Sequence, residues 1–425
     1  MGLHLPTMNA TLFMSLAFGL ALLLNTLTKL WLLSRQVRSV AQHRAQVPAS
    51  FANSIDLPAH QKAADYTLAK SRVALYDLAL DALLLLAWTL LGGLQWLDQT
   101  LLAWLGTGLM QQMALIVGFI LIGGLINLPM AAYQTFVLEQ GFGFNRSTPA
   151  LWWSDMAKGI AVGAVLGLPI LALVLWLMQV GGDAWWFYAW AALAVYQLFV
   201  MWIAPNWIMP LFNKFTPLKD PALEERVTAL MQRTGFSAKG FYVMDGSRRS
   251  AHSNAFFTGF GTHKRVVFFD TLLEQLSADE MEAVLAHELG HFKHKHITQM
   301  MLLQTVQSLL GFALLGWLIQ QAWFFTGLGV QPHMDGTNQA LALLLFLMGM
   351  PVVMFFLSPL SALHSRRCEF QADAFAGAHA SSAQLASALL KLYQDNATTL
   401  TPDPWFVAFY HSHPPAAQRL ARMGA

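Results

Sequence analysis

Residues 277–321 read SADEMEAVLAHELGHFKHKHITQMMLLQTVQSLLGFALLGWLIQQ, and this stretch determines how the chain is organised. It opens with Ser277 and Glu280 in the spacing of a capping box, in which each side chain satisfies a backbone N–H at the start of a helix. No proline follows before Gln321. We therefore predict a helix that begins at Ser277 and runs, continuously or with one break, into an apolar segment long enough to cross a bilayer. Its polar first half should lie close to one membrane face.

Apolar runs of this length recur along the whole chain. Of the 425 residues, 56% are hydrophobic and only 11% are charged, against about 25% charged in an ordinary soluble domain. We count seven runs, at roughly 9–33, 74–97, 107–132, 159–180, 184–208, 301–324 and 338–360. The sequence thus predicts an α-helical multi-pass membrane protein with seven transmembrane helices.

All the basic residues fall on one side of such a bundle. With Lys29 and Lys158 counted in their adjacent loops, the segments 34–73, 133–158, 209–300 and 361–425 hold 7, 2, 11 and 5 of the 25 Lys and Arg residues. The other connections hold none. Because positive charge marks the cytoplasmic side, we expect the N-terminus outside and these four segments inside. The net charge is only +2, without a basic stripe, so nucleic acid is not an expected partner.

This topology divides the chain into four parts. Residues 1–208 hold spans one to five, 209–300 an inner domain with the HELGH helix, 301–360 spans six and seven, and 361–425 a second inner segment. Within 209–300, a helix-like stretch at Asp220–Thr234 and strand-like stretches at 240–244 and 265–269 predict a small α+β domain. Gly259 and Gly261 indicate a turn before the second strand.

The chemistry centres on His287-Glu288-Leu289-Gly290-His291, an HExxH motif. On a helix the two histidines are one turn apart, so both imidazoles can bind one Zn²⁺, while Glu288 serves as general base on the attacking water. A catalytic zinc site needs a third protein ligand. Glu369 and Asp373 stand four apart on a predicted helix after the last span, so that one can bind zinc while the other holds a ligand imidazole.

Other histidines and the single cysteine remain to be assigned. His294 is an alternative third ligand, although interfacial polar residues are the favoured interpretation of His294 and His296. His411 and His413 precede Pro414-Pro415, and a histidine fixed there could donate to an oxyanion. Cys368 is the only cysteine, so the chain cannot form an intramolecular disulfide or a thiolate-rich metal cluster. We expect Cys368 to be a packed side chain.

At these residues the sequence resembles the CAAX prenyl protease 1 family, integral-membrane zinc peptidases that trim prenylated C-terminal CAAX sequences. The resemblance lies in ordered motifs between about residues 130 and 420, namely 136–139, 143–145, 208–218, 245–250, 252–255, 269–273, HELGH, 369–373 and 412–415.

The resemblance implies a role for each matching residue. His287, His291 and Glu369 would bind one zinc ion, Glu288 would be the base and Asp373 would support a ligand. His413 and Arg419 would lie near the substrate carbonyl. Asn254 and Ala255 would lie on a strand that receives the peptide by β-augmentation. The resemblance also implies seven helices forming a barrel-like chamber into which the zinc site opens.

The expected partners are a peptide or protein substrate, with or without a prenyl group, and membrane lipid, with the enzyme as a monomer. Short outer connections and an end at Ala425 without a retrieval signal favour a bacterial member in the inner (plasma) membrane. Two alternatives stay open. One is a quality-control protease for membrane proteins, without prenyl specificity. The other is a transporter or lipid-binding channel with a structural metal, which the intramembrane residues Asn25, Asp77 and Asp81 would support.

Overall fold

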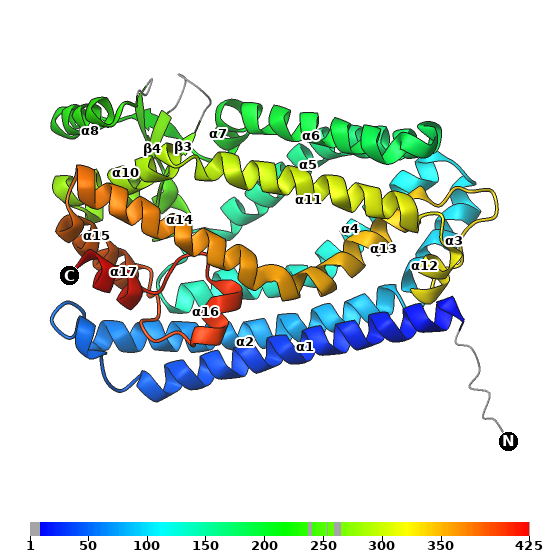
Figure 1. The fold of residues 1–425 in the computed structure, drawn as a ribbon, viewed down its shortest axis with the longest axis horizontal. Helices are drawn as coiled ribbons and strands as arrows, with labels where there is room; N and C mark the ends of the chain where they lie inside the picture. The colour runs from blue at the N-terminus through cyan, green and yellow to red at the C-terminus, as the bar shows by residue number, and fades with distance from the viewer. Residues whose placement is uncertain (1–8, 237–239, 253, 259–264, 425) are drawn as a thin grey trace.

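The computed structural model describes residues 9–236, 240–252, 254–258 and 265–424 (Figure 1). The turn expected at Gly259 and Gly261 lies outside these residues. Long helices run side by side along the molecule, and a small sheet with its own helices lies at the same end as the C-terminus.

Six helical segments are long and apolar enough to cross a membrane, and a bent helix pair brings the number to seven. The six single segments are Ala10–His43, Leu109–Glu139, Pro149–Val180, Gly182–Phe212, His296–Leu318 and Gln339–His379. They contain the helices α1 (Ala10–His43), α4 (Leu109–Tyr133), α5 (Pro149–Val180), α6 (Trp185–Ile203), α7 (Met209–Phe212), α11 (His296–Leu318), α13 (Gln339–Met354) and α14 (Ser358–His379). The expected count of seven holds when the bent pair is one span.

The second span differs from its prediction. Instead of one helix at 74–97, α2 (Leu57–Trp88) and α3 (Gly93–Leu105) meet at an angle of 51°. Gly92 lies between them with a φ of 79°, a left-handed conformation that glycine adopts without steric cost. A Cβ on Gly93 would lie 2.6 Å from the carbonyl oxygen of Ala87, so glycine also permits the tight approach. The apolar run continues through the break, which is why hydropathy alone does not reveal it.

The sheet contains four strands in the order β1-β2-β4-β3. Two of them lie where they were predicted, and β3 is an edge strand that pairs antiparallel with β4. Around the sheet pack helices from the inner domain and the C-terminal segment. The strands are β1 (Phe215–Pro217), β2 (Phe241–Met244), β3 (Ala255–Thr258) and β4 (Arg265–Phe269), and these helices are α8 (Pro221–Thr234), α9 (Asp270–Gln275), α10 (Ala278–Lys293), α15 (Ser382–Asp395) and α17 (Ala416–Met423). Two further short helices, α12 (Ala322–Gly327) and α16 (Pro404–Tyr410), contact α1.

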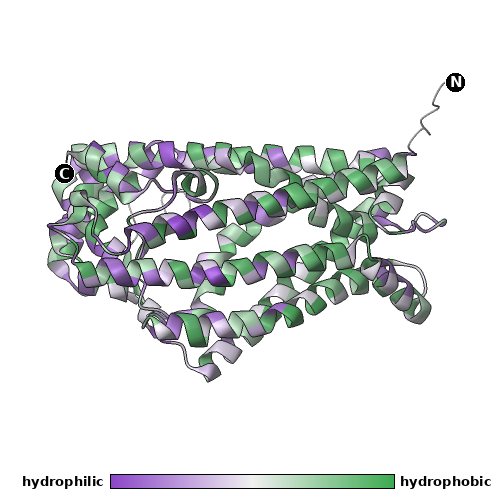
Figure 2. Ribbon diagram, turned by 90° about the horizontal axis from the view of Figure 1, so that it is seen from below, coloured by the Kyte–Doolittle hydropathy of each residue, from purple (hydrophilic) through white to green (hydrophobic). Residues whose placement is uncertain are grey.

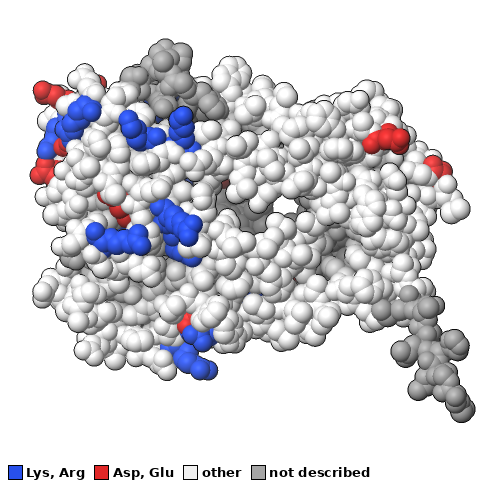
Figure 3. Space-filling view, viewed as in Figure 1, with Lys and Arg blue, Asp and Glu red and all other residues white. Residues whose placement is uncertain are grey.

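The described residues form four hydrophobic clusters, of which two are large. One joins the helices α3, α4, α5 and α13 at the end away from the sheet, through Leu94, Leu115, Leu175 and Leu345. The other joins the sheet to α8, α10, α14 and α15. Hydrophilic helix segments gather at the end of the molecule that holds the sheet (Figure 2). Lys and Arg side chains lie over the same end in Figure 3, as the basic partition predicts.

The bundle is hollow. Figure 3 shows a depression in the middle of the visible face, between α11 and the α13–α14 segment. A cavity of about 800 Å³ lies among α5, α6, α11 and α13, and its lining is apolar apart from Gln307 and Ser308. The cavity is thus bordered by four of the long apolar helices.

The helix that carries the HELGH motif ends with one break before span six. Lys295 has a φ of 57°, in the left-handed region, so α10 ends at Lys293 and α11 begins at His296. The polar segment and the span are therefore separate helices, joined by two residues.

Candidate active site

Local chemistry in the sequence explains why α10 forms. The Ser277 hydroxyl accepts a hydrogen bond from the Glu280 N–H, and the Glu280 carboxylate accepts one from the Ser277 N–H. Leu285 and Leu289 are both 1% exposed and anchor α10 in the core of the inner domain. The face with His287, Glu288 and His291 is thereby held toward α14 and the pocket.

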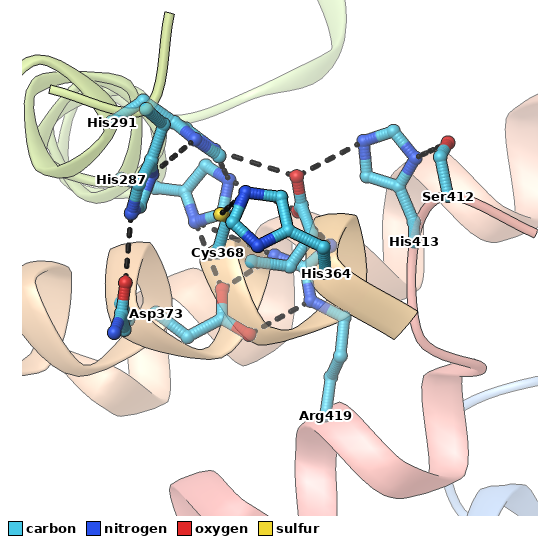
Figure 4. A network of polar contacts seen from close by, with 11 residues as sticks. His287, His291, His364, Cys368, Asp373, Ser412, His413 and Arg419 are labelled. Atoms are coloured by element: carbon cyan, nitrogen blue, oxygen red, sulfur yellow. Dashed lines mark hydrogen bonds and ion pairs between the residues drawn. The ribbon is translucent and has the colours of Figure 1, made fainter. Parts of the chain in front are cut away.

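His287, His291 and Glu369 form a compact group in which one potential ligand atom from each lies within 4.8 Å of the others (Figure 4). The Nε2 atoms of the two histidines are 3.2 Å apart. Glu369 Oε2 lies 3.5 Å from His287 Nε2, and Glu369 Oε1 lies 3.4 Å from His291 Nε2. Glu369 is 4% exposed, and Oε2 has no hydrogen-bond partner among the described residues. Two imidazoles and a carboxylate with an unsatisfied oxygen fit a metal ion.

The second ring nitrogen of His287, Nδ1, faces the carboxylate of Asp373. His287 Nδ1 lies 2.9 Å from Asp373 Oδ1. Arg419 donates to both oxygens of Asp373, from Nε at 2.9 Å and from Nη2 at 2.5 Å. Asp373 and Arg419 are 6% and 5% exposed, so this ion pair is buried. Burial lowers the pKa of His287, but the carboxylates of Asp373 and Glu369 outweigh it and raise the pKa to about 9.

The outward nitrogen of His291 meets His296, which corrects the expectation that His296 is an interfacial polar residue. His296 is 2% exposed, and its Nδ1 lies 3.0 Å from His291 Nδ1. Its Nε2 contacts Gln371 Oε1 at 2.8 Å. The break at Lys295 turns the chain so that His296 points back to the site. Sequence reasoning missed this contact because no pattern signals a left-handed lysine.

A pocket of about 130 Å³ brings most of the other expected residues together. Its polar lining comes from four separate parts of the chain: β3 and the residue before it, α10, α14, and the segment that leads into α17. The lining residues are Asn254, Ala255, Leu272, Val284, His287, Glu288, Glu369, Leu385, Leu389, Leu392, His413 and Arg419. Asp373 is not among them and stands behind His287.

Glu288 and His413 face this pocket in different ways. Glu288 is partly exposed, and burial raises the pKa of its carboxyl, with His287 and Arg419 opposing the effect and Glu369 adding to it. The His413 side chain is 64% exposed, and its Nε2 lies 3.4 Å from Glu369 Oε1. Ser412 Oγ contacts His413 Nδ1 at 3.0 Å. The imidazole thus stands at the mouth of the pocket beside the ligand group (Figure 4).

The remaining candidates lie around the site. His294 caps α10 and stacks on His296, outside the group of potential metal ligands. The carbonyl oxygen of His411 accepts a hydrogen bond from Arg366 at 2.8 Å. Cys368 is buried, as expected of a packed side chain, and its Sγ lies 3.7 Å from His364 Nε2 on the same helix.

The residues that would support a transporter interact with residues on neighbouring helices. The Asn25 amide donates to the Val352 carbonyl at 2.8 Å, and Asp77 accepts from Gln134 at 3.3 Å. Asp81 lies close enough to Lys29 to interact electrostatically. These polar contacts join neighbouring helices, a structural role that does not require transport.

Comparisons with known proteins agree with this geometry. Residues 36–214 match the CAAX prenyl protease N-terminal family with five membrane helices, and residues 217–425 match Peptidase family M48. CAAX prenyl protease 1 of Saccharomyces cerevisiae is 37% identical over 313 residues, which are 70% of this chain and 69% of the yeast protein. The CAAX prenyl protease 1 homolog of Homo sapiens is 31% identical over 460 residues, covering 95% of this chain and 94% of the human protein.

A crystal structure of S. mikatae Ste24p superimposes with a TM-score of 0.91 at 30% identity and covers 99% of this chain and 100% of that one. This likeness confirms the expected fold class, a multi-pass helical chamber with a small α+β domain at one end. The family match in turn implies a metal cofactor. The chain therefore belongs to the CAAX prenyl protease 1 family within the M48 peptidases and is a multi-pass membrane metalloendopeptidase.

Proposed function

We propose that this protein is a zinc endopeptidase that cleaves prenylated proteins near the C-terminus, within the CAAX sequence. The observation that carries the proposal is the group of His287, His291 and Glu369, which stands beside Glu288 in a pocket bordered by an edge strand. A hydrolytic site of this kind needs metal ligands, a base and a place for the peptide, and residues for each are adjacent.

His287, His291 and Glu369 would hold the metal, and their two nitrogens and one carboxylate are the donor set of known zinc hydrolases. When bound, zinc supplies Lewis acidity, which polarises the scissile carbonyl and acidifies the attacking water. Asp373 would accept the Nδ1 proton of His287 and so direct Nε2 toward the metal. His296 would do the same for His291.

Glu288 would move the protons. Its carboxylate takes a proton from the attacking water, and the resulting carboxylic acid gives that proton to the leaving amine. The raised pKa of Glu288 favours the first transfer, because a carboxylate whose conjugate acid has a higher pKa is a stronger base toward the attacking water.

The edge strand and the C-terminal segment would bind the substrate. Among the described residues β3 pairs only with β4, so its other edge can offer backbone groups to a peptide strand beside Asn254 and Ala255. His413 would donate to the carbonyl oxygen as negative charge develops there. Arg419 is bonded to Asp373, so its contribution near the carbonyl would be a positive charge behind the ligands.

The apolar cavity supports a lipidated substrate. It begins at Gln307, which is eleven residues beyond His296, or about 16 Å along α11 at 1.5 Å per residue. A prenyl chain attached next to the scissile bond would extend into the bundle in this direction. The relatives named above are called CAAX prenyl proteases, which favours the same substrate class.

The one-sided distribution of Lys and Arg supports a topology with the N-terminus outside and the site on the cytoplasmic side. We further propose a monomer in a bacterial inner membrane, and four parts of the chain at 1–208, 209–300, 301–360 and 361–425. The eukaryotic relatives named above do not bear on the host.

A comparison of two peptides tests the substrate. A farnesylated CAAX peptide should be cleaved at least tenfold faster than its unprenylated twin by purified, zinc-loaded protein. Equal rates would refute prenyl specificity and favour a membrane quality-control protease. Glu288→Ala should keep its zinc and lose cleavage, and retained cleavage would refute the assigned base. Phenanthroline should abolish wild-type activity.

A further inference from the structure

His252 lies two residues before Asn254, at the end of the loop that leads into β3. Its backbone is held on both sides: the N–H donates to Ser250 Oγ at 3.2 Å, and the carbonyl accepts from Thr271 Oγ1 at 3.2 Å. The position of this residue therefore determines where the chain enters the edge strand that borders the pocket.

The His252 ring contacts three separate parts of the protein. Nδ1 lies 2.9 Å from Asn396 Oδ1, in the turn after α15. Nε2 lies 3.6 Å from Glu139 Oε2, at the end of the third span. The ring also stacks on Phe144, with centroids 4.5 Å apart and an interplanar angle of 25°. A single imidazole thus joins the approach to β3 to a membrane helix and to the C-terminal segment.

Glu139 is itself fixed. It ends the π-helical turn Gln134–Glu139 that follows α4, and its Oε1 accepts a hydrogen bond from Tyr66 Oη on α2 at 2.5 Å. Its carbonyl oxygen accepts from the Phe144 N–H at 2.8 Å. The chain after it pairs with the loop before His252, through Ala251 N–H to the Phe144 carbonyl at 3.0 Å. Two membrane helices therefore hold the carboxylate that faces His252.

Among the contacts of the described residues, none joins the His252 ring to His287, Glu288 or Glu369. We propose that His252 is a positioning residue: Glu139, Asn396 and Phe144 hold its ring, and it sets the register in which a peptide pairs with β3 at Asn254 and Ala255. This inference rests on the proposed function. It also means that α2 and α4 determine the placement of the strand that receives substrate.

The expected effect on KM and kcat depends on the stage of the reaction at which the substrate pairs with β3. Pairing with β3 is present in the bound substrate and persists in the transition state, so its loss raises KM and leaves kcat nearly unchanged. We expect His252→Ala to raise KM about tenfold with kcat within twofold of wild type. Glu139→Gln should raise KM less, because the amide can still accept from Tyr66. Adding Glu139→Gln to His252→Ala should have little further effect, since both act on one contact.

Asp65→Asn is a matched control. Asp65 is the neighbour of Tyr66 on α2 and pairs with Arg44, at 2.6 Å, on the protein surface. Asp65→Asn loses an ion pair on α2, the helix that also carries Tyr66, and should leave KM and kcat unchanged. Zinc content and thermal unfolding should be measured for every variant, and if His252→Ala does not fold, Glu139→Gln and Asn396→Ala test the same contacts.

Binding provides a second test without turnover. In a Glu288→Ala background, His252→Ala should raise the Kd of a fluorescent farnesylated CAAX peptide about tenfold. An unchanged KM and Kd in a folded, zinc-loaded protein would overturn the inference while leaving the peptidase assignment intact. A loss of kcat at constant KM would also overturn it, because His252 would then act in the chemical step. If the wild type neither binds nor cleaves the peptide, the proposed function fails, and this inference fails with it.

Discussion

Asp373→Asn tests the carboxylate that links the metal ligand His287 to the buried Arg419. The substitution keeps the shape of the side chain but removes the charge that faces His287 Nδ1 and the guanidinium of Arg419. Loss of a carboxylate partner of a ligand histidine typically weakens metal binding about 10- to 100-fold, which corresponds to about 1.4–2.8 kcal/mol. We expect zinc affinity to fall within this range.

Loss of the Asp373 charge also lowers the stability of the fold, because it leaves the buried Arg419 without its main ion-pair partner. Arg419 is 5% exposed, and the only other carboxylate that it approaches among the described residues is Glu369, with Nη1 to Oε2 at 3.8 Å. Breaking a buried pair typically destabilises a protein by about 3–5 kcal/mol. In the variant, Arg419 should also be drawn toward Glu369 and compete with the metal for that oxygen. Changing Arg419→Gln as well should restore much of the stability, because the uncompensated charge is gone.

Zinc affinity can be measured by competition with a coloured chelator, and stability by thermal unfolding of the detergent-solubilised protein. Asp65→Asn, which breaks an exposed pair, should change stability by at most about 1 kcal/mol and leave zinc affinity unchanged. A folded Asp373→Asn protein with a zinc Kd within twofold of wild type would show that Asp373 does not support the ligand.

Three further substitutions address the helices around the site. Burial raises the pKa of Glu280, but its hydrogen bonds, led by the one from Lys391, outweigh burial and lower this pKa to about 2. The ionised Glu280 carboxylate therefore stabilises the fold above about pH 4.5, and this stabilisation is lost as the pH falls toward 2. Glu280→Gln should flatten the fall of the melting temperature across that window, and an unchanged pH profile would contradict this account. Gly290→Ala should destabilise by about 1–3 kcal/mol, because its Cβ would lie 2.9 Å from the Ala372 Cα; a melting temperature equal to wild type would show that α10 and α14 separate easily. Lys295→Gly should stabilise by about 1 kcal/mol, since Lys295 has a φ of 57°; destabilisation would show that the lysine side chain makes a compensating contact.

Features that depend on neighbouring residues in the sequence were predictable. The capping box at Ser277 and Glu280, the helix spacing of His287 and His291, and the apolar runs are all local patterns with a direct physical meaning. They placed α10, the pair of histidines and most of the spans. The pairing of Glu369 with this helix followed because the two segments were predicted on the same membrane side.

Contacts that depend on single backbone angles or distant residues were not predictable from local patterns. The break between α2 and α3 lies inside an uninterrupted apolar run. His296 reaches His291 only because Lys295 adopts a left-handed conformation. The contact between Arg419 and Asp373 joins residues 46 positions apart, and nothing local indicates that this arginine is buried rather than exposed.

The arrangement of the metal-binding residues along the chain has a consequence during synthesis. His287 and His291 precede α11 and α13, whereas Glu369 follows them on α14. The ribosome therefore completes the HELGH helix well before Glu369 exists, and Glu369 reaches the histidines only after two further segments have crossed the bilayer. The nascent chain would carry an incomplete ligand set throughout this interval. Proteolytic activity would then appear only once insertion of the last spans is finished, so that a partly inserted chain cannot cleave its neighbours or itself.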